Sequence, residues 1–164
     1  DQVQQFVEAV KSSQQEDGIR FHFFGEMNVK LKDLLSGLSS VKLHGIVSKN
    51  EIQQVLNCAD IGMLFLTDDL TYSFSTKFCE YLQYRKPIWV ISNEGLCPSF
   101  IVTNNLGWHS LPNKESILEA ISQLEKLPIL YKPEDRVVQS FNLDRLAKDY
   151  LEVLNYVMND DGIQ

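Results

Sequence analysis

Hydrophobic positions along the chain follow two alternating spacings, one typical of helices and one typical of strands. In residues 2–14 the apolar side chains recur at i, i+3, i+4 and i+7, which predicts an amphipathic helix. The run 19–24 is rich in β-branched and aromatic residues and predicts a strand. In chain order, the pattern then predicts a helix at 29–38, a strand at 41–47, a helix opened by Ser48, a strand at 61–66, a helix from 75 onward, a strand at 88–91, a short helix at 97–105, an edge strand at 107–111, and helices at 113–128 and 142–158.

The sequence "SKNE" at 48–51 predicts a capping box at the start of one helix. The Ser48 hydroxyl can accept a hydrogen bond from the backbone N–H of Glu51, while the Glu51 carboxylate accepts one from the backbone of Ser48. Such a pair satisfies amides that a helix N-terminus otherwise leaves without partners. The start of this helix is therefore predicted to the residue.

The alternation of strands and helices predicts an α/β protein. We expect a Rossmann-like, doubly wound parallel sheet in three α/β/α layers, formed by residues 1–164 as a single domain. The last helix, 142–158, is expected to close this domain by packing onto the sheet. Ligands in such folds bind outside the carboxyl ends of the strands. The loops at that edge are those that follow Phe24, Val47, Leu66 and Ile91.

The bulk composition is that of an ordinary globular protein, with 44% hydrophobic and 23% charged residues. A net charge of −7 argues against a general nucleic-acid binder. No run of about 18 apolar residues is present, so no membrane-spanning helix is predicted, and no signal peptide is visible. We therefore expect a cytoplasmic location. Because the chain opens without Met, we expect a fragment of a longer, two-domain protein.

The positions of cysteine and histidine predict neither a disulfide nor a metal site. Cys58, Cys79 and Cys97 are widely spaced and form no C-x2-C pair, which is typical of reduced cysteines. The three histidines have no ligand-like spacing, although His22 and His44 lie in strands that can be neighbours. We expect no metal and no cofactor.

The stretch "STKFCEYLQYRKPIWVI", which begins at Ser75, carries the main candidate chemistry. A helix N-terminus offers unpaired N–H groups, so Ser75 and Thr76 next to Lys77 predict a phosphate or diphosphate site. Glu80 lies about one turn further along, where its carboxylate can accept hydrogen bonds from a ribose diol. The alternative is structural: a hydroxyl caps the helix, Lys77 is solvated, and Glu80 pairs with Lys77 or Arg85.

The same stretch resembles the pattern P-x-K-x-x-E-Y-x-x-x-G-K-P-V-I of GT-B glycosyltransferases, mainly family 4. The segment "VKLHGIVSKNEIQQVLNCADIGMLFL" is similar to that family's strand and helix, followed by A-D-I and an apolar strand. The segment "NNLGWHSLPNKESILEAISQLEKL" resembles the family's short strand after a glycine and its following helix. In order and spacing, these segments cover nearly the whole chain.

The resemblance implies the C-terminal, donor-binding half of a GT-B enzyme, with a nucleotide-sugar as substrate. It implies that Glu80 binds the donor ribose and that Ser75 and Thr76 lie beside the diphosphate; a phosphate role for Lys77 is our inference. The loop after the second strand would line the base pocket. The full set of expected donor-binding residues is Gly25, Gly45, Ile46, Val47, Tyr72, Phe74, Ser75, Thr76, Lys77 and Glu80.

The chain departs from the family pattern at three places. Many members carry E-x7-E, and the first Glu, which contacts the donor sugar, is replaced here by Tyr72. Asp68 and Asp69 of the same loop are either substitutes or solvated loop acids. Arg85 stands where the pattern has Gly. The family's first strand of this domain, with basic residues that hold the diphosphate, would precede Asp1.

We therefore expect the donor domain of a retaining, metal-independent glycosyltransferase, which would use a UDP- or GDP-sugar and a saccharide or lipid-linked acceptor. By analogy, its setting is bacterial surface polysaccharide synthesis, in the cytoplasm or at the periphery of the inner membrane. The N-terminal acceptor-binding domain is missing, so the fragment is expected to bind a donor weakly and to catalyse nothing. The alternatives are a GT-B-fold sugar-nucleotide epimerase and a degenerate, non-catalytic scaffold, which Tyr72 favours.

Overall fold

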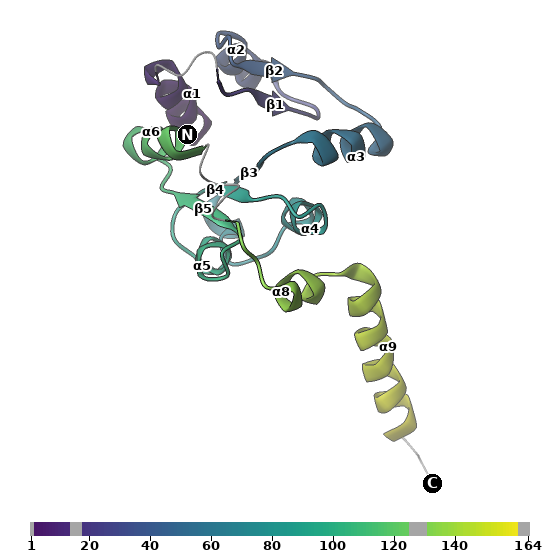
Figure 1. The fold of residues 1–164 in the computed structure, drawn as a ribbon. Coiled ribbons are helices and arrows are strands. Elements are labelled where there is room, and N and C mark those ends of the chain that lie inside the picture. The colour runs from purple at the N-terminus through teal and green to yellow at the C-terminus, as the bar shows by residue number, and fades with distance from the viewer. Residues whose placement is uncertain (1, 14–17, 125–130, 161–164) are drawn as a thin grey trace.

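The chain folds into alternating helices and parallel strands, followed by a long C-terminal helix (Figure 1). The structure is a computed structural model, and it describes residues 2–13, 18–124 and 131–160. In chain order the elements are α1 (Gln2–Ser12), β1 (Phe21–Phe23), α2 (Val29–Ser36), β2 (Val41–Leu43), α3 (Lys49–Cys58), β3 (Gly62–Phe65), the short 3-10 helix η1 (Asp68–Leu70), α4 (Thr76–Gln83), β4 (Ile88–Ile91), α5 (Leu96–Thr103), β5 (Gly107–Ser110), α6 (Lys114–Gln123), α8 (Asp135–Ser140) and α9 (Leu143–Asp160).

The predicted capping box at the start of α3 is confirmed. The Ser48 hydroxyl accepts the N–H of Glu51 at 3.3 Å, and the Glu51 carboxylate accepts the N–H of Ser48 at 2.7 Å. The Ser48 hydroxyl also donates to the Glu51 carboxylate at 2.7 Å, and this bond, followed by the one from the Ser48 backbone, holds the pKa of Glu51 below its ordinary value. The helix predicted at 113–128 is present as α6, and its final residues lie outside the described part of the chain.

The first two strands are shorter than the sequence predicts. Strand β1 ends at Phe23 and β2 ends at Leu43, although the apolar patterns run to positions 24 and 47. Beyond the strands the backbone passes through Gly25 and Gly45, whose φ values are 109° and 69°. These left-handed conformations suit glycine and end the extended backbone.

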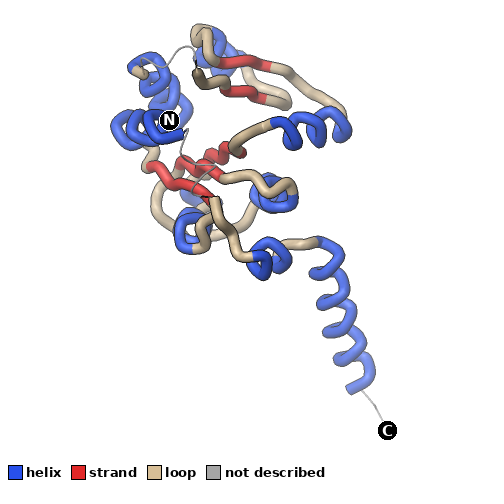
Figure 2. The backbone as a smooth tube through the Cα atoms, in the orientation of Figure 1, coloured by secondary structure: helices blue, strands red, loops and turns tan. Residues whose placement is uncertain are grey.

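The strands form two parallel sheets instead of the single sheet expected from the sequence (Figure 2). Strand β1 pairs with β2, and β4 lies between β3 and β5. Within the described residues, β1 and β3 each have one edge without a strand partner. The ring of Phe6 on α1 lies 5.0 Å from that of Phe21 and 5.6 Å from that of Phe65. The two sheets therefore share one core beside these open edges.

The three-stranded sheet has helices on both faces, which confirms the α/β/α layers for this part of the chain. Trp89 and Ile91 of β4 pack in the cluster that contains α1 and α6, whereas Ile88 and Val90 pack with α4 and α5. All four side chains are buried, and each such burial contributes roughly 1.5–3 kcal/mol. Strand β5 is the edge strand that the sequence predicts.

The β1–β2 pair is covered on one face only. Phe21 is buried, and Phe23 packs against the same cluster, but His22 and Lys42 on the opposite face are exposed. The expectation of helices on both faces is therefore wrong for this pair. Helix α3, which follows β2, buries Leu56 but leaves most of its surface exposed.

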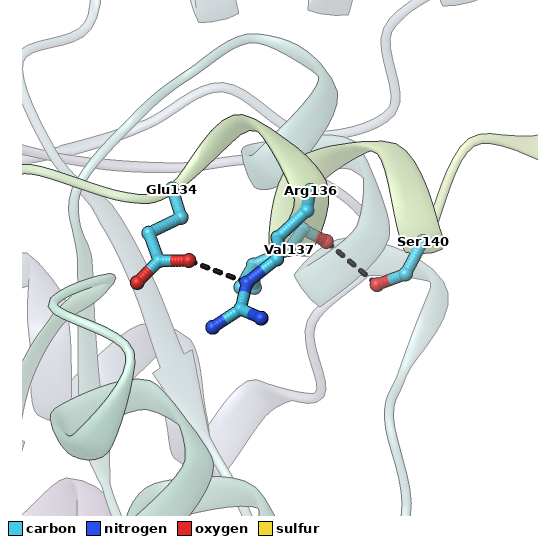
Figure 3. Close-up of polar contacts among 4 residues, drawn as sticks. All are labelled: Glu134, Arg136, Val137 and Ser140. Atoms are coloured by element: carbon cyan, nitrogen blue, oxygen red, sulfur yellow. Dashed lines mark hydrogen bonds and ion pairs between the residues drawn. The ribbon is translucent and has the colours of Figure 1, made fainter.

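The C-terminal segment begins with the short helix α8. Helix α8 carries its own side-chain contacts: the guanidinium of Arg136 pairs with the carboxylate of Glu134, and the Ser140 hydroxyl donates to the carbonyl of Val137 at 2.7 Å (Figure 3). The ring of Phe141, directly after α8, lies 5.0–5.1 Å from those of Phe74 and Phe78.

Helix α9 extends away from the rest of the molecule (Figure 1). Every side chain from 144 to 157 is exposed. The expectation that helix 142–158 packs onto the sheet is therefore wrong. The aromatic surface formed by α4 and α5 is contacted instead by Phe141, directly after α8.

Candidate functional site

The N-terminus of α4 lies beyond the carboxyl end of β3, at the ligand-binding edge of a parallel sheet. Ser75 is the N-cap residue, and its hydroxyl accepts the N–H of Phe78 at 3.2 Å. Ser75 therefore caps the helix, as the structural interpretation of this stretch predicts. The N–H groups of Thr76 and Lys77 remain at the start of the helix without a partner in the same helix, which is the general property of a first turn.

The side chains of Lys77 and Glu80 are exposed, and no hydrogen bond or ion pair joins either to another described residue. Arg85, the other partner considered for Glu80, pairs instead with Asp135 at 2.8 Å. The pairings of the structural alternative are therefore not formed in this structure. The Glu80 carboxylate is available to a ligand.

The amphipathic pattern of α4 explains why these groups face solvent. Phe78 and Leu82 are fully buried in the second core cluster and fix the orientation of the helix. Thr76 and Glu80 fall one turn apart on the opposite, exposed side. Tyr81 anchors the helix to β3 by donating to the carbonyl of Met63 at 3.2 Å; burial, followed by the charge of Glu80, raises its pKa to about 12.

Two expected donor-binding residues before α4 have different surroundings. The ring of Phe74 is half-buried and lies 4.9 Å from that of Phe78 and 5.1 Å from that of Phe100. Its side chain therefore packs the core beneath the loop. Tyr72 is 72% exposed, so its ring and hydroxyl are accessible where the family pattern has a carboxylate.

The loops after β1 and β2 lie side by side. The N–H of Gly25 donates to the carbonyl of Gly45 at 2.6 Å, and the N–H of His44 donates to the carbonyl of Phe23 at 2.9 Å. Ile46 is 77% exposed, which leaves an apolar side chain free to contact a ligand, and Val47 is half-buried.

The structure places both groups of predicted residues after the carboxyl ends of parallel strands. No hydrogen bond joins the β1–β2 loops to the start of α4 within the described residues. A small cavity of about 120 Å³ lies at the other edge, near the amino ends of β1 and β2, where Lys11, Ile19 and Ser40 are part of its lining. None of the predicted donor residues lines this cavity, and we assign no donor role to it.

Sequence reasoning missed a bridge between the loops after β3 and β4. The side-chain amide of Asn93 donates to the Asp68 carboxylate at 2.7 Å, and the N–H of Cys97 donates to the carbonyl of Thr71 at 2.8 Å. The Asp69 carboxylate accepts the Thr67 hydroxyl at 2.6 Å. The carboxylates of Asp68 and Asp69 thus stabilise the loop after β3. The signal in the sequence for the Asp68–Asn93 contact is that polar residues directly follow two neighbouring strands.

The described residues contain no group of three or more side chains suited to hold a metal ion. All three cysteines are free thiols; burial raises the pKa of Cys97 to about 11, which keeps it protonated and unreactive. No described helix is both long and apolar enough to cross a membrane.

Compared with known proteins, the chain matches no family model and no curated sequence.

Proposed function

We propose that this chain is the donor-binding half of a GT-B-type glycosyltransferase and that it binds the nucleotide part of a UDP- or GDP-sugar. The observation that carries the proposal is the exposed Glu80 carboxylate, free of described partners, one turn beyond the N-terminus of α4. Glu80 would accept hydrogen bonds from the ribose diol. The first-turn N–H groups and Lys77 would lie beside the diphosphate.

The backbone at Arg85 supports the resemblance. The family pattern has Gly at this position, between the helix and the Lys-Pro that precedes the next strand. The φ of Arg85 is 50°, in the left-handed region that glycine favours. The turn geometry that the pattern requires is therefore kept although the residue type has changed.

The open edges of β1 and β3 also support the proposal. The resemblance places a further strand before Asp1, and a strand between β1 and β3 would pair with both edges beneath Phe6. Gln2, at the start of α1, donates from its side chain to the carbonyl of Leu66 directly after β3, at 2.7 Å. A strand in the gap would therefore lead directly into α1 at the carboxyl edge of the sheet.

The chemistry of the site is binding and stabilisation of charge. A nucleoside diphosphate is the leaving group, so positive charge and helix N–H groups beside it stabilise the transition state more than the ground state. The sugar would lie towards the partner domain, with Tyr72 in place of the usual carboxylate. We assign no catalytic residue to this chain, and the N-terminal domain would supply the acceptor.

The proposal is tested by following backbone amide shifts of this chain by NMR during titration with UDP and, separately, GDP. We expect shifts at Gly25, at 45–47 and at 72–80, and the nucleotide that binds more tightly names the donor class. Glu80→Ala removes two charge-assisted hydrogen bonds and should weaken binding by roughly 10-fold or more.

The matched control is Glu119→Ala, which removes an exposed carboxylate from the middle of α6 and should leave the affinity unchanged. If neither nucleotide shifts these amides at millimolar concentration, the donor site does not exist and a non-catalytic scaffold becomes the better explanation. Equal weakening by both substitutions would show that net charge, and not Glu80, controls binding.

A further inference from the structure

Two histidines on the uncovered face of the β1–β2 pair are joined by a hydrogen bond. Nδ1 of His22 and Nε2 of His44 lie 3.0 Å apart. The ring centroids are 5.1 Å apart and the ring planes differ by 15°. Because the centroid separation is close to the N–N distance plus the two ring radii, the rings lie edge to edge. Their lone-pair directions meet head-on, which leaves room for one proton between the two nitrogens and not for a metal ion.

The pair is held in place by a third ring. Phe24 stacks on His44 with centroids 4.3 Å apart and planes 10° apart. His22 is on β1, whereas His44 directly follows β2, so the hydrogen bond links the two strands at the point where their loops begin. The next residues are Gly25 and Gly45, whose backbones are hydrogen-bonded at 2.6 Å.

We propose that the His22–His44 pair is a proton-sensitive latch that holds the loops after β1 and β2 together while it carries no more than one net positive charge. When both rings are neutral, or when one is charged, one nitrogen donates and the other accepts. When both rings are charged, two N–H groups face each other and the hydrogen bond is lost. Acidification therefore releases the link between the two loops.

The surroundings of the pair oppose double protonation. Partial burial, then the neighbouring His22, then Lys42 hold the pKa of His44 below its ordinary value of about 6.5. Lys42 lies opposite His22 in the strand register. Arg20 and Glu26 flank β1, and no hydrogen bond or ion pair joins either to the two rings within the described residues. Because the pKa of His44 is lowered in the folded state, the stability that the uncharged His44 ring contributes is complete above the ordinary histidine pKa. It is lost as the pH falls from that value through the lowered pKa.

The latch is tested by NMR titration of the imidazole nitrogens between pH 4.5 and 8.5. His109 serves as the internal reference, because its Nε2 donates to the carbonyl of Ser92 at 2.9 Å and it takes no part in the pair. We expect His22 and His44 to titrate in two separate steps. In His22→Gln the remaining His44 should titrate at a higher pH than in the native chain.

The loop response is read from the hydrogen-exchange protection of the Gly25 amide across the same pH range, corrected for the intrinsic exchange rate. Protection should fall together with the second protonation step in the native chain. In His22→Gln and His44→Gln that step should disappear from the Gly25 profile. Independent titration of the two rings, or Gly25 protection that does not change between pH 7 and the second step, would overturn the proposal.

Discussion

Gly107 determines how near β5 can lie to β4. It opens β5 with a φ of 156°, and a Cβ built on it would lie 1.9 Å from the carbonyl oxygen of Ile88. Ile88 and Gly107 are register partners, so the contact is between the backbones of paired strands. No side-chain rotation can relieve it. The edge strand can approach β4 only because this position has no side chain.

We predict that Gly107→Ala lowers the free energy of unfolding by about 3 kcal/mol or more, because the backbones of β4 and β5 must separate. Urea denaturation followed by circular dichroism measures the change. Gly37→Ala is the matched control, since its Cβ would meet no atom within 4 Å and its φ is −79°. That control should remain within about 1 kcal/mol of the native chain. Equal effects of the two substitutions would contradict the backbone contact.

At the scale of elements, the contrast between α8 and α9 depends on aromatic packing. The rings of Phe74, Phe78, Phe100 and Phe141 all lie within 4.9–6.3 Å of one another, and they join α4, α5 and the residue after α8. Helix α9 has a broad apolar stripe but no such contact along its described side chains. An amphipathic pattern thus predicts a helix without specifying where the helix packs.

We predict that a chain ending at Asn142 keeps its melting temperature within about 2 °C of the full chain, because α9 buries no described side chain from 144 to 157. Thermal unfolding by differential scanning calorimetry provides the measurement. Phe141→Ala in the full chain is the comparison, and it should cost about 2–4 kcal/mol because it removes the ring that attaches α8. A truncation as damaging as Phe141→Ala would mean that α9 packs on the domain in solution.

At the scale of the whole molecule, the two sheets differ in how they are supported. Strand β4 is paired on both sides and all four of its residues are buried. Among the described strands, β1 and β2 pair only with each other, and one face of this pair is exposed. The shared core around Phe6 links the two parts, but pairing and burial are concentrated in the three-stranded sheet.

We therefore predict that backbone amides of β4 exchange with solvent only through global unfolding, while those of β1 and β2 exchange through smaller, local openings. Native-state hydrogen exchange at increasing denaturant distinguishes the two modes. Exchange free energies of Val90 and Ile91 should match the global value, and those of Phe23 and Leu43 should be lower. Equal protection of both sheets would indicate that the open edges are closed in solution.

Most elements follow from the sequence by itself, because helix and strand spacing, glycine breaks and the Ser48 capping box depend on residues a few positions apart. Helix α8 was not predicted, and β1 begins two residues later than its apolar pattern. Only the tertiary structure decided that β1 and β3 are not paired, that Arg85 selects Asp135 and leaves Glu80 free, and that His22 meets His44. These outcomes depend on where distant segments lie in space, and an apolar strand pattern does not encode its neighbour. For the same reason, the amphipathic pattern of the last helix fixed its secondary structure but not its place in the fold.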